Sequence, residues 1–127
     1  MMSKKWWLIL LGAASLFALQ CRAETSEEML SACRTISTAK VSNGNIVMPE
    51  DFESGKCWGA FEVLQNLLRV ENTSTKQSFF GVCMPEKATR TELIAIFIQY
   101  MGKHPEKYSD GFSFVVLSAL WEPFHCK

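Results

Sequence analysis

The sequence predicts an all-α fold: a small, disulfide-stapled bundle of about four helices in two antiparallel hairpins. Three observations support this prediction. Apolar residues recur at three- and four-residue spacing in four segments, two of these segments open with a capping box, and glycines and prolines separate them. The chain has 127 residues, of which 48% are hydrophobic, so one buried core is expected.

Residues 1–23 have the pattern of a cleavable secretory signal peptide. Two lysines precede an uncharged apolar run from Trp6 to Leu19, and Ala23 is a small residue suited to cleavage. The run is shorter than the about 20 residues that span a bilayer, which favours cleavage over a retained anchor. Lipidation at Cys21 is the weaker alternative, because Gln20 stands where a small residue is expected. We therefore expect residues 24–127 to form one soluble domain in the periplasm.

The expected mature domain is mildly acidic. Cleavage removes three of the thirteen basic residues and none of the thirteen acidic residues, which leaves a net charge of −3 with neutral histidines. A nucleic-acid partner would require a basic face, and the sequence has no basic cluster. We expect no nucleic-acid binding.

Four cysteines remain in residues 24–127: Cys33, Cys57, Cys83 and Cys126. An even number in a small exported domain indicates two disulfides. A zinc site is the weaker alternative, because the spacing contains no C-x-x-C pair and no nearby histidine ladder. Four cysteines allow three pairings. We favour Cys33 with Cys57 and Cys83 with Cys126, because these positions meet at helix ends in antiparallel hairpins.

The first two helices are expected on either side of a long loop. A capping box at Thr25-x-x-Glu28 predicts a first helix that continues through Ile36, and residues 37–54 then read as a loop with a turn at 42–45. The second helix should follow Gly55 and end near Val70. Its core stripe is predicted to contain Cys57, Phe61, Leu64 and Leu68, widened by Ala60 and Leu67. The polar segment 71–78 is predicted to be an exposed loop.

The third and fourth helices are expected in the C-terminal half. A second capping box, Thr89-x-x-Glu92, predicts a helix that Gly102 closes. The fourth helix is predicted to begin at Pro105 and to end at Pro123, with an inner face made of Tyr108, Phe112, Val115, Val116, Ala119 and Leu120. Residues 112–117 could also form a strand, but the entry proline and the sustained spacing favour a helix.

Candidate catalytic groups are few in this sequence. His104 and His125 are the two histidines, and both lie beside turns or helix ends, where capping or solvent contact is the simpler role. The acidic groups 27–28, 50–53 and Glu106 lie near expected helix starts, where negative charge is electrostatically favoured. We therefore predict no catalytic residue, no metal site and no cofactor.

Most aromatic residues are assigned to the core, Phe114 included. Trp58 and Trp121 fall off the main stripes, and Phe79-Phe80 follow a polar segment. We therefore expect some apolar surface to remain for a dimer or a protein partner.

Five short motifs occur in order across residues 29–126. They are Met29-Leu30-x-x-Cys33, Cys57-x-Gly59, Cys83-x-Pro85, Tyr100-Met101-x-x-His104-Pro105-Glu106, and Ala119-Leu120 with Phe124-x-Cys126. In these motifs the chain resembles the Rap/Tai family, the periplasmic immunity proteins that protect bacteria from type VI secreted peptidoglycan amidases. The closing motif departs from the family, which usually has proline where this chain has His125.

The resemblance implies a helical periplasmic protein, often a homodimer, that inhibits a cognate amidase by plugging its substrate groove. It implies no enzymatic activity and no small-molecule ligand. Toxin-contacting residues vary within the family and are not carried over. Our own expectation for the partner surface is one of the two loops, 71–78 or 37–54, because loops on rigid scaffolds usually hold recognition residues. The alternative function is a periplasmic helical chaperone or stress protein.

Overall fold

A computed structural model describes residues 23–42, 45–75, 78 and 80–127. The predicted signal peptide, residues 1–23, lies outside the described residues except for Ala23. The described residues form four α-helices, a short two-stranded hairpin and two disulfides, so the all-α prediction is confirmed. The elements in order are α2 (Ser26–Ser37), β1 (Lys40–Ser42), β2 (Asn45–Val47), α3 (Phe52–Thr75), α4 (Arg90–Lys103), the 3-10 helix η1 (Pro105–Lys107) and α5 (Phe112–Phe124).

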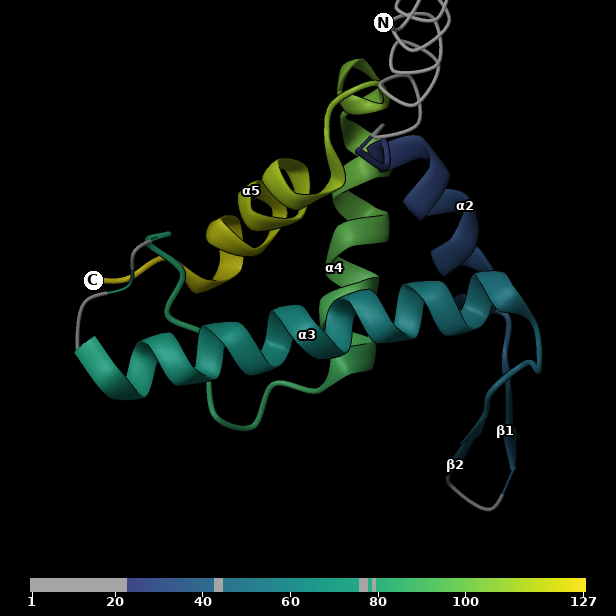
Figure 1. Ribbon diagram of the computed structural model, residues 1–127, viewed down its shortest axis with the longest axis horizontal. Helices are drawn as coiled ribbons and strands as arrows, with labels where there is room; N and C mark the ends of the chain where they lie inside the picture. Colours follow the sequence, from purple (N-terminus) through teal and green to yellow (C-terminus); the bar gives the residue numbers. More distant parts are fainter. Residues whose placement is uncertain (1–22, 43–44, 76–77, 79) are drawn as a thin grey trace, which may run out of the picture.

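The helices cross one another around a shared core (Figure 1). The long α3 runs across α4, while α2 and α5 diverge on the two sides of the upper part of α4. Fully buried Phe61 of α3 and Phe97 of α4 have ring centroids 5.8 Å apart. The ring of Phe112, at the start of α5, lies 5.8 Å from the first and 5.3 Å from the second. This aromatic cluster joins three of the four helices.

The two predicted capping threonines occupy the N-cap positions of their helices. The Thr25 hydroxyl accepts a hydrogen bond from the Glu28 amide, and the Glu28 carboxylate accepts one from the Thr25 amide at 2.9 Å, which completes the capping box of α2. Thr89 accepts from the Glu92 amide at the start of α4. Each cap satisfies an amide that the helix itself cannot pair.

The expected loop between the first two helices is more ordered than predicted. Residues 40–42 and 45–47 pair as antiparallel strands, with Val41 opposite Ile46. Helix α3 begins at Phe52, before Gly55, because Asp51 caps it by accepting a hydrogen bond from the Ser54 amide at 2.8 Å. The helix also continues to Thr75, so the prediction of a loop over 71–78 is wrong for residues 71–75.

The predicted start of the fourth helix at Pro105 is wrong. The segment contains the short helix η1 and a turn, and α5 begins only after Gly111. The N-terminal residues of the domain pair with this turn: the Ser26 amide donates to the Asp110 carbonyl at 2.8 Å, and the Phe112 amide donates to the Glu24 carbonyl at 3.1 Å. These main-chain bonds replace those that a continuous helix would make. Residues 112–117 are helical, so the strand alternative does not apply.

The C-terminus is fixed against the segment before α4. The Cys83 amide donates to the Phe124 carbonyl, and the Cys126 amide donates to the Gly81 carbonyl at 3.0 Å. Pro123 lies in the last turn of α5, which ends one residue later. Among the described residues, every helix is too short or too polar to cross a membrane.

Candidate functional site: an exposed apolar face

The disulfides join the cysteines in the pairing that the sequence favoured. Cys33 is bonded to Cys57, and Cys83 is bonded to Cys126. The first pair is fully buried between α2 and α3, whereas Cys83 is exposed. The first disulfide therefore ties two helices together inside the core, and the second ties the two ends of the C-terminal half together at the surface.

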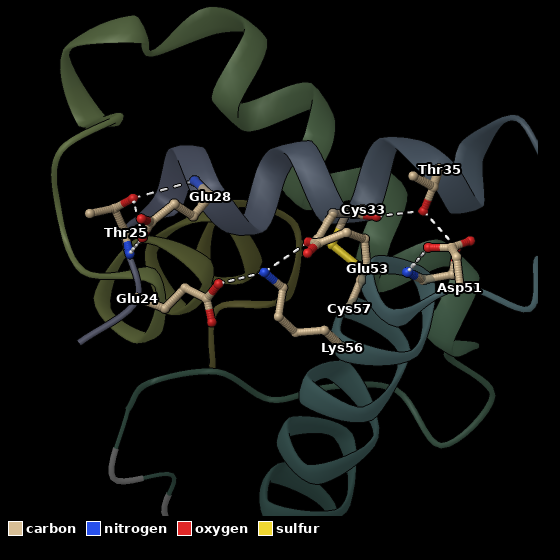
Figure 2. A network of polar contacts seen from close by, with 11 residues as sticks. Glu24, Thr25, Glu28, Cys33, Thr35, Asp51, Glu53, Lys56 and Cys57 are labelled. Carbon is tan, nitrogen blue, oxygen red and sulfur yellow. Dashed lines mark hydrogen bonds and ion pairs between the residues drawn. A yellow bond between two sulfur atoms is a disulfide. The ribbon is translucent and has the colours of Figure 1, made fainter. Parts of the chain in front are cut away.

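A polar network surrounds the start of α2 and the start of α3 (Figure 2). Lys56 lies between two carboxylates, with Nζ 2.7 Å from Glu24 and 2.8 Å from Glu53. The hydrogen bond to Glu24, followed by that to Glu53, raises the pKa of Lys56. The Asp51 pKa is lowered by hydrogen bonds from the backbone amide and the hydroxyl of Ser54. Asp51 and Glu53 lie at the start of α3, as the sequence indicated, and all three carboxylates pair with a neighbouring side chain or amide.

The two histidines lie at helix ends in the C-terminal half of the chain, where His104 caps α4 and His125 caps α5. His104 Nδ1 is 2.9 Å from the Glu106 carboxylate, and its ring stacks on Tyr100 with centroids 4.2 Å apart. The pKa of Glu106 is lowered by a hydrogen bond from its own backbone amide and by that of His104. Among the described residues, no group of three or more histidine, cysteine, aspartate or glutamate side chains is arranged to hold a metal ion.

Helix α3 carries a second apolar stripe, which begins at the partly buried Ala60 and is otherwise exposed. Val63, Leu67 and Val70 are 69%, 51% and 62% exposed, and together with Ala60 they follow a spacing of three, four and three residues. This is the spacing of a coiled-coil seam. The prediction that Leu67 widens the core stripe is therefore wrong, whereas Ala60 is partly buried and packs against the core as predicted.

An open groove with a volume of about 530 Å³ lies between α3 and α5. We call it the α3–α5 groove. From α3 it is lined by part of the exposed stripe, and from α5 by Phe112, Val116 and Leu117. The lining residues are Ala60, Val63, Leu64, Leu67, Phe80, Phe112, Ser113, Val116 and Leu117, of which Ser113 alone is polar. Because both walls are helices with apolar side chains one turn apart, the groove suits the apolar face of another helix.

Phe80 is held at the border of this groove by Gly81. Gly81 has a φ angle of +68°, and its amide donates to the Ser78 carbonyl at 3.2 Å. A Cβ atom at this position would lie 3.2 Å from Nε1 of Trp121. Glycine is thus required both by the backbone conformation and by the close approach of the indole.

The exposed face continues over the outer side of α5. Phe80, Phe114 and Trp121 are 47%, 65% and 52% exposed. The expectation of surplus apolar surface is confirmed at Trp121 and Phe80, whereas the assignment of Phe114 to the core is wrong. Trp58 is partly covered by Arg90, whose guanidinium lies 4.4 Å from the ring centroid. Phe79 lies outside the described residues.

The sequence reasoning placed the partner surface on the two loops and missed the helical face. A signal for it exists in the sequence, because Ala60, Val63, Leu67 and Val70 form a seam that is offset from the core stripe of the same helix. Large exposed apolar patches on a small domain mark interaction surfaces.

The fold and this face together define a disulfide-stapled all-α domain with an exposed apolar face. A comparison of the chain with known protein families, curated proteins and solved structures finds no match.

Proposed function

We propose that the protein is a periplasmic immunity protein that binds and inhibits a cognate type VI secreted peptidoglycan amidase and so protects the cell from self or sibling intoxication. The observation that carries this proposal is the exposed apolar face of α3 and α5 on a domain whose four helices and two disulfides agree with the resemblance to the Rap/Tai family. A protein inhibitor needs such a surface and needs no catalytic group of its own.

The motifs of the resemblance occupy positions that build this scaffold. Cys57 forms its disulfide with Cys33 from an early turn of α3. Cys83 forms the disulfide that holds the segment containing Phe80, and His104 is the C-cap of α4. The two disulfides fit an oxidising compartment, which supports export to the periplasm by the proposed signal peptide. A partner that degrades the cell wall would act in the same compartment.

A homodimer is part of the proposal, with the exposed stripe of α3 as its seam. Two copies of this helix related by a two-fold axis would place the stripe of one copy against that of the other, as in other helix pairs with this spacing. Leu67→Lys should then dissociate the dimer in analytical ultracentrifugation and leave the folded monomer intact. Leu68→Lys is the matched control, because the neighbouring Leu68 is fully buried and its replacement should unfold the chain instead.

The decisive experiment is co-expression with the amidase encoded by the adjacent gene. Export of the amidase should stop growth, and the exported full chain should restore it and co-purify with the amidase. If the exported chain failed to restore growth and formed no complex with the amidase, the proposal would be contradicted.

The second candidate function is a periplasmic chaperone or stress protein, which the same exposed apolar face favours. A chaperone would suppress the aggregation of unrelated proteins, whereas an immunity protein would bind one partner. Light scattering of a reduced model client, with and without the oxidised protein, separates the two functions.

A further inference from the structure

A second hollow lies beside the α3–α5 groove and has a volume of about 440 Å³. It shares Phe80 and Leu117 with the groove, and we call it the aromatic pocket. Four of its lining residues are aromatic and one is acidic: they are Phe80, Tyr100, Phe114, Leu117, Ser118, Trp121 and Glu122. The residues from α5 share one face of that helix, since the other four lie three, four, seven and eight positions after Phe114. The pocket thus combines aromatic walls with a single carboxylate.

Two of the aromatic lining residues, Tyr100 and Trp121, are in contact with histidine rings. Tyr100 stacks on His104, and His104 is held by Glu106 at 2.9 Å, which gives the His104-Pro105-Glu106 motif a positioning role. Trp121 lies close to Gly81, and its ring contacts that of His125 in a tilted arrangement with centroids 5.3 Å apart. A binding site whose side chains are already fixed loses less conformational freedom when its ligand arrives.

The chemistry of the pocket favours a cation with an apolar stem. The faces of aromatic rings carry negative potential and attract ammonium and guanidinium groups. The chain already shows this preference at the edge of the pocket, where Nζ of its own Lys107 lies 6.0 Å from the centroid of the Phe114 ring. The pocket lining contains the Glu122 carboxylate and no basic side chain, while Lys107 lies at its edge and Lys103 lines the neighbouring hollow that also contacts Glu122.

We infer that the aromatic pocket receives a basic side chain, arginine or lysine, of a protein partner. The alkyl stem packs along the aromatic walls, and the charged head reaches Glu122 while it remains in contact with water. A purely apolar side chain would leave the carboxylate unused. The inference rests on the proposed function only for the identity of the partner, because the preference of the pocket for a basic side chain can be measured without that partner.

The test is an NMR titration of the oxidised, exported protein with two small probes. N-acetyl-arginine methylamide carries the cation, and N-acetyl-citrulline methylamide is its neutral isostere. Binding of a single residue should be weak, with a dissociation constant in the millimolar range. The arginine probe should shift the indole signal of Trp121 and the amide of Ser118 and should leave the indole of Trp58 unchanged. The citrulline probe should shift Trp121 much less.

Variants locate the effect within the pocket. Glu122→Gln removes the carboxylate and should weaken arginine binding about threefold, the size expected for an exposed ion pair. Trp121→Leu removes one aromatic wall and should weaken it about two- to fivefold. Glu86→Gln is the matched control, because it removes one exposed negative charge outside the pocket and should bind like the wild type.

Three results would overturn the inference: equal shifts with both probes, no shift at Trp121, or unchanged arginine binding by Glu122→Gln. Trp121 is 52% exposed and Glu122 is exposed, so neither substitution disturbs the core, and the Trp58 indole signal reports whether each variant has kept its fold. A protein that binds the arginine probe at Trp121 but forms no complex with the amidase would leave this inference standing and contradict the proposed function alone.

Discussion

The two disulfides differ in burial, and this difference predicts how the domain responds to their removal. Cys33 and Cys57 are fully buried, whereas Cys83 is exposed and Cys126 is half-buried. The pairs are 24 and 43 residues apart, so the chain-entropy model gives contributions of about 3.5 and about 4.0 kcal/mol to the free energy of unfolding. On entropy alone, loss of the second disulfide costs slightly more.

Serine replacement should reverse this order. At positions 33 and 57 serine places two hydroxyls in a fully buried, apolar site, and removal of a hydroxyl from water costs about 1–3 kcal/mol. At positions 83 and 126 water can solvate the hydroxyls. Alanine replacement removes the covalent bond at either site and introduces no polar group, so it isolates the entropic contribution together with a small loss of packing.

Urea unfolding of four double variants, followed by far-UV circular dichroism, measures these contributions. We expect Cys33→Ser with Cys57→Ser to be less stable than the matching alanine variant by about 1–3 kcal/mol. For Cys83 and Cys126, the serine and alanine variants should agree within about 0.5 kcal/mol. Equal serine-to-alanine differences at the two sites would refute the argument that burial sets the cost.

Three further predictions concern the polar contacts and the glycines. The hydrogen bond from Lys56 to Glu24 raises the pKa of the lysine. The contribution of this lysine to the stability of the fold is therefore complete below its unfolded pKa of about 10.4 and disappears as pH rises through the higher folded pKa. The melting temperatures of Lys56→Met and the wild type should converge at alkaline pH. A backbone hydrogen bond lowers the pKa of Asp51, so the cap contributes fully above the unfolded value of about 3.9 and weakens as pH falls through the lower folded value. Asp51→Ala should lower the urea midpoint near neutral pH, and a smaller difference in urea midpoints at neutral pH than at acid pH would contradict this sign. Gly81→Ala should destabilise the fold by about 1–2 kcal/mol because residue 81 has a positive φ. Gly102→Ala, which has open space around it in α4, should stabilise the fold by about 0.5–1 kcal/mol. Differential scanning calorimetry measures both effects, and melting temperatures that shifted in the same direction would contradict the structure.

Local signals in the sequence were sufficient to predict the helix starts at Thr25 and Thr89. In each case the capping hydroxyl and the amide that it accepts from are three residues apart, so no distant part of the chain is involved. The disulfide pairing followed from the same information, since it required only that Cys33 end one helix and Cys57 begin the next.

Long-range contacts explain the errors. The delayed start of α5 depends on main-chain bonds from residues 24–27 to residues 108–112, and nothing within residues 105–112 indicates that such a partner is present. Pro105 is a valid helix start, and the structure uses it for one turn of 3-10 helix. Periodicity correctly showed that the segment is helical but could not show where tertiary bonds interrupt the helix.

The candidate site was hard to predict because α3 has two apolar stripes. Phe61 and Leu68 face the core, while Val63 and Leu67 face solvent, and each pair fits helical spacing of apolar residues. Which stripe faces the core depends on the positions of α2 and α4. The sequence could therefore show that surplus apolar surface exists but could not show that it lies on a helix instead of on the neighbouring loops.

The exposed face also bears on the choice between the two proposed functions. Val63 and Leu67 contribute little to the stability of the isolated domain, because burial is what makes an apolar side chain stabilising and these two remain in water. Either proposed function would account for them by an interaction outside the chain. A chaperone for unrelated clients needs only apolar area, whereas the aromatic pocket combines a carboxylate, Glu122, with aromatic rings and so favours a positive charge at one place. That preference is a means of discriminating between partners. The pocket therefore favours a protein with one specific partner over a general chaperone.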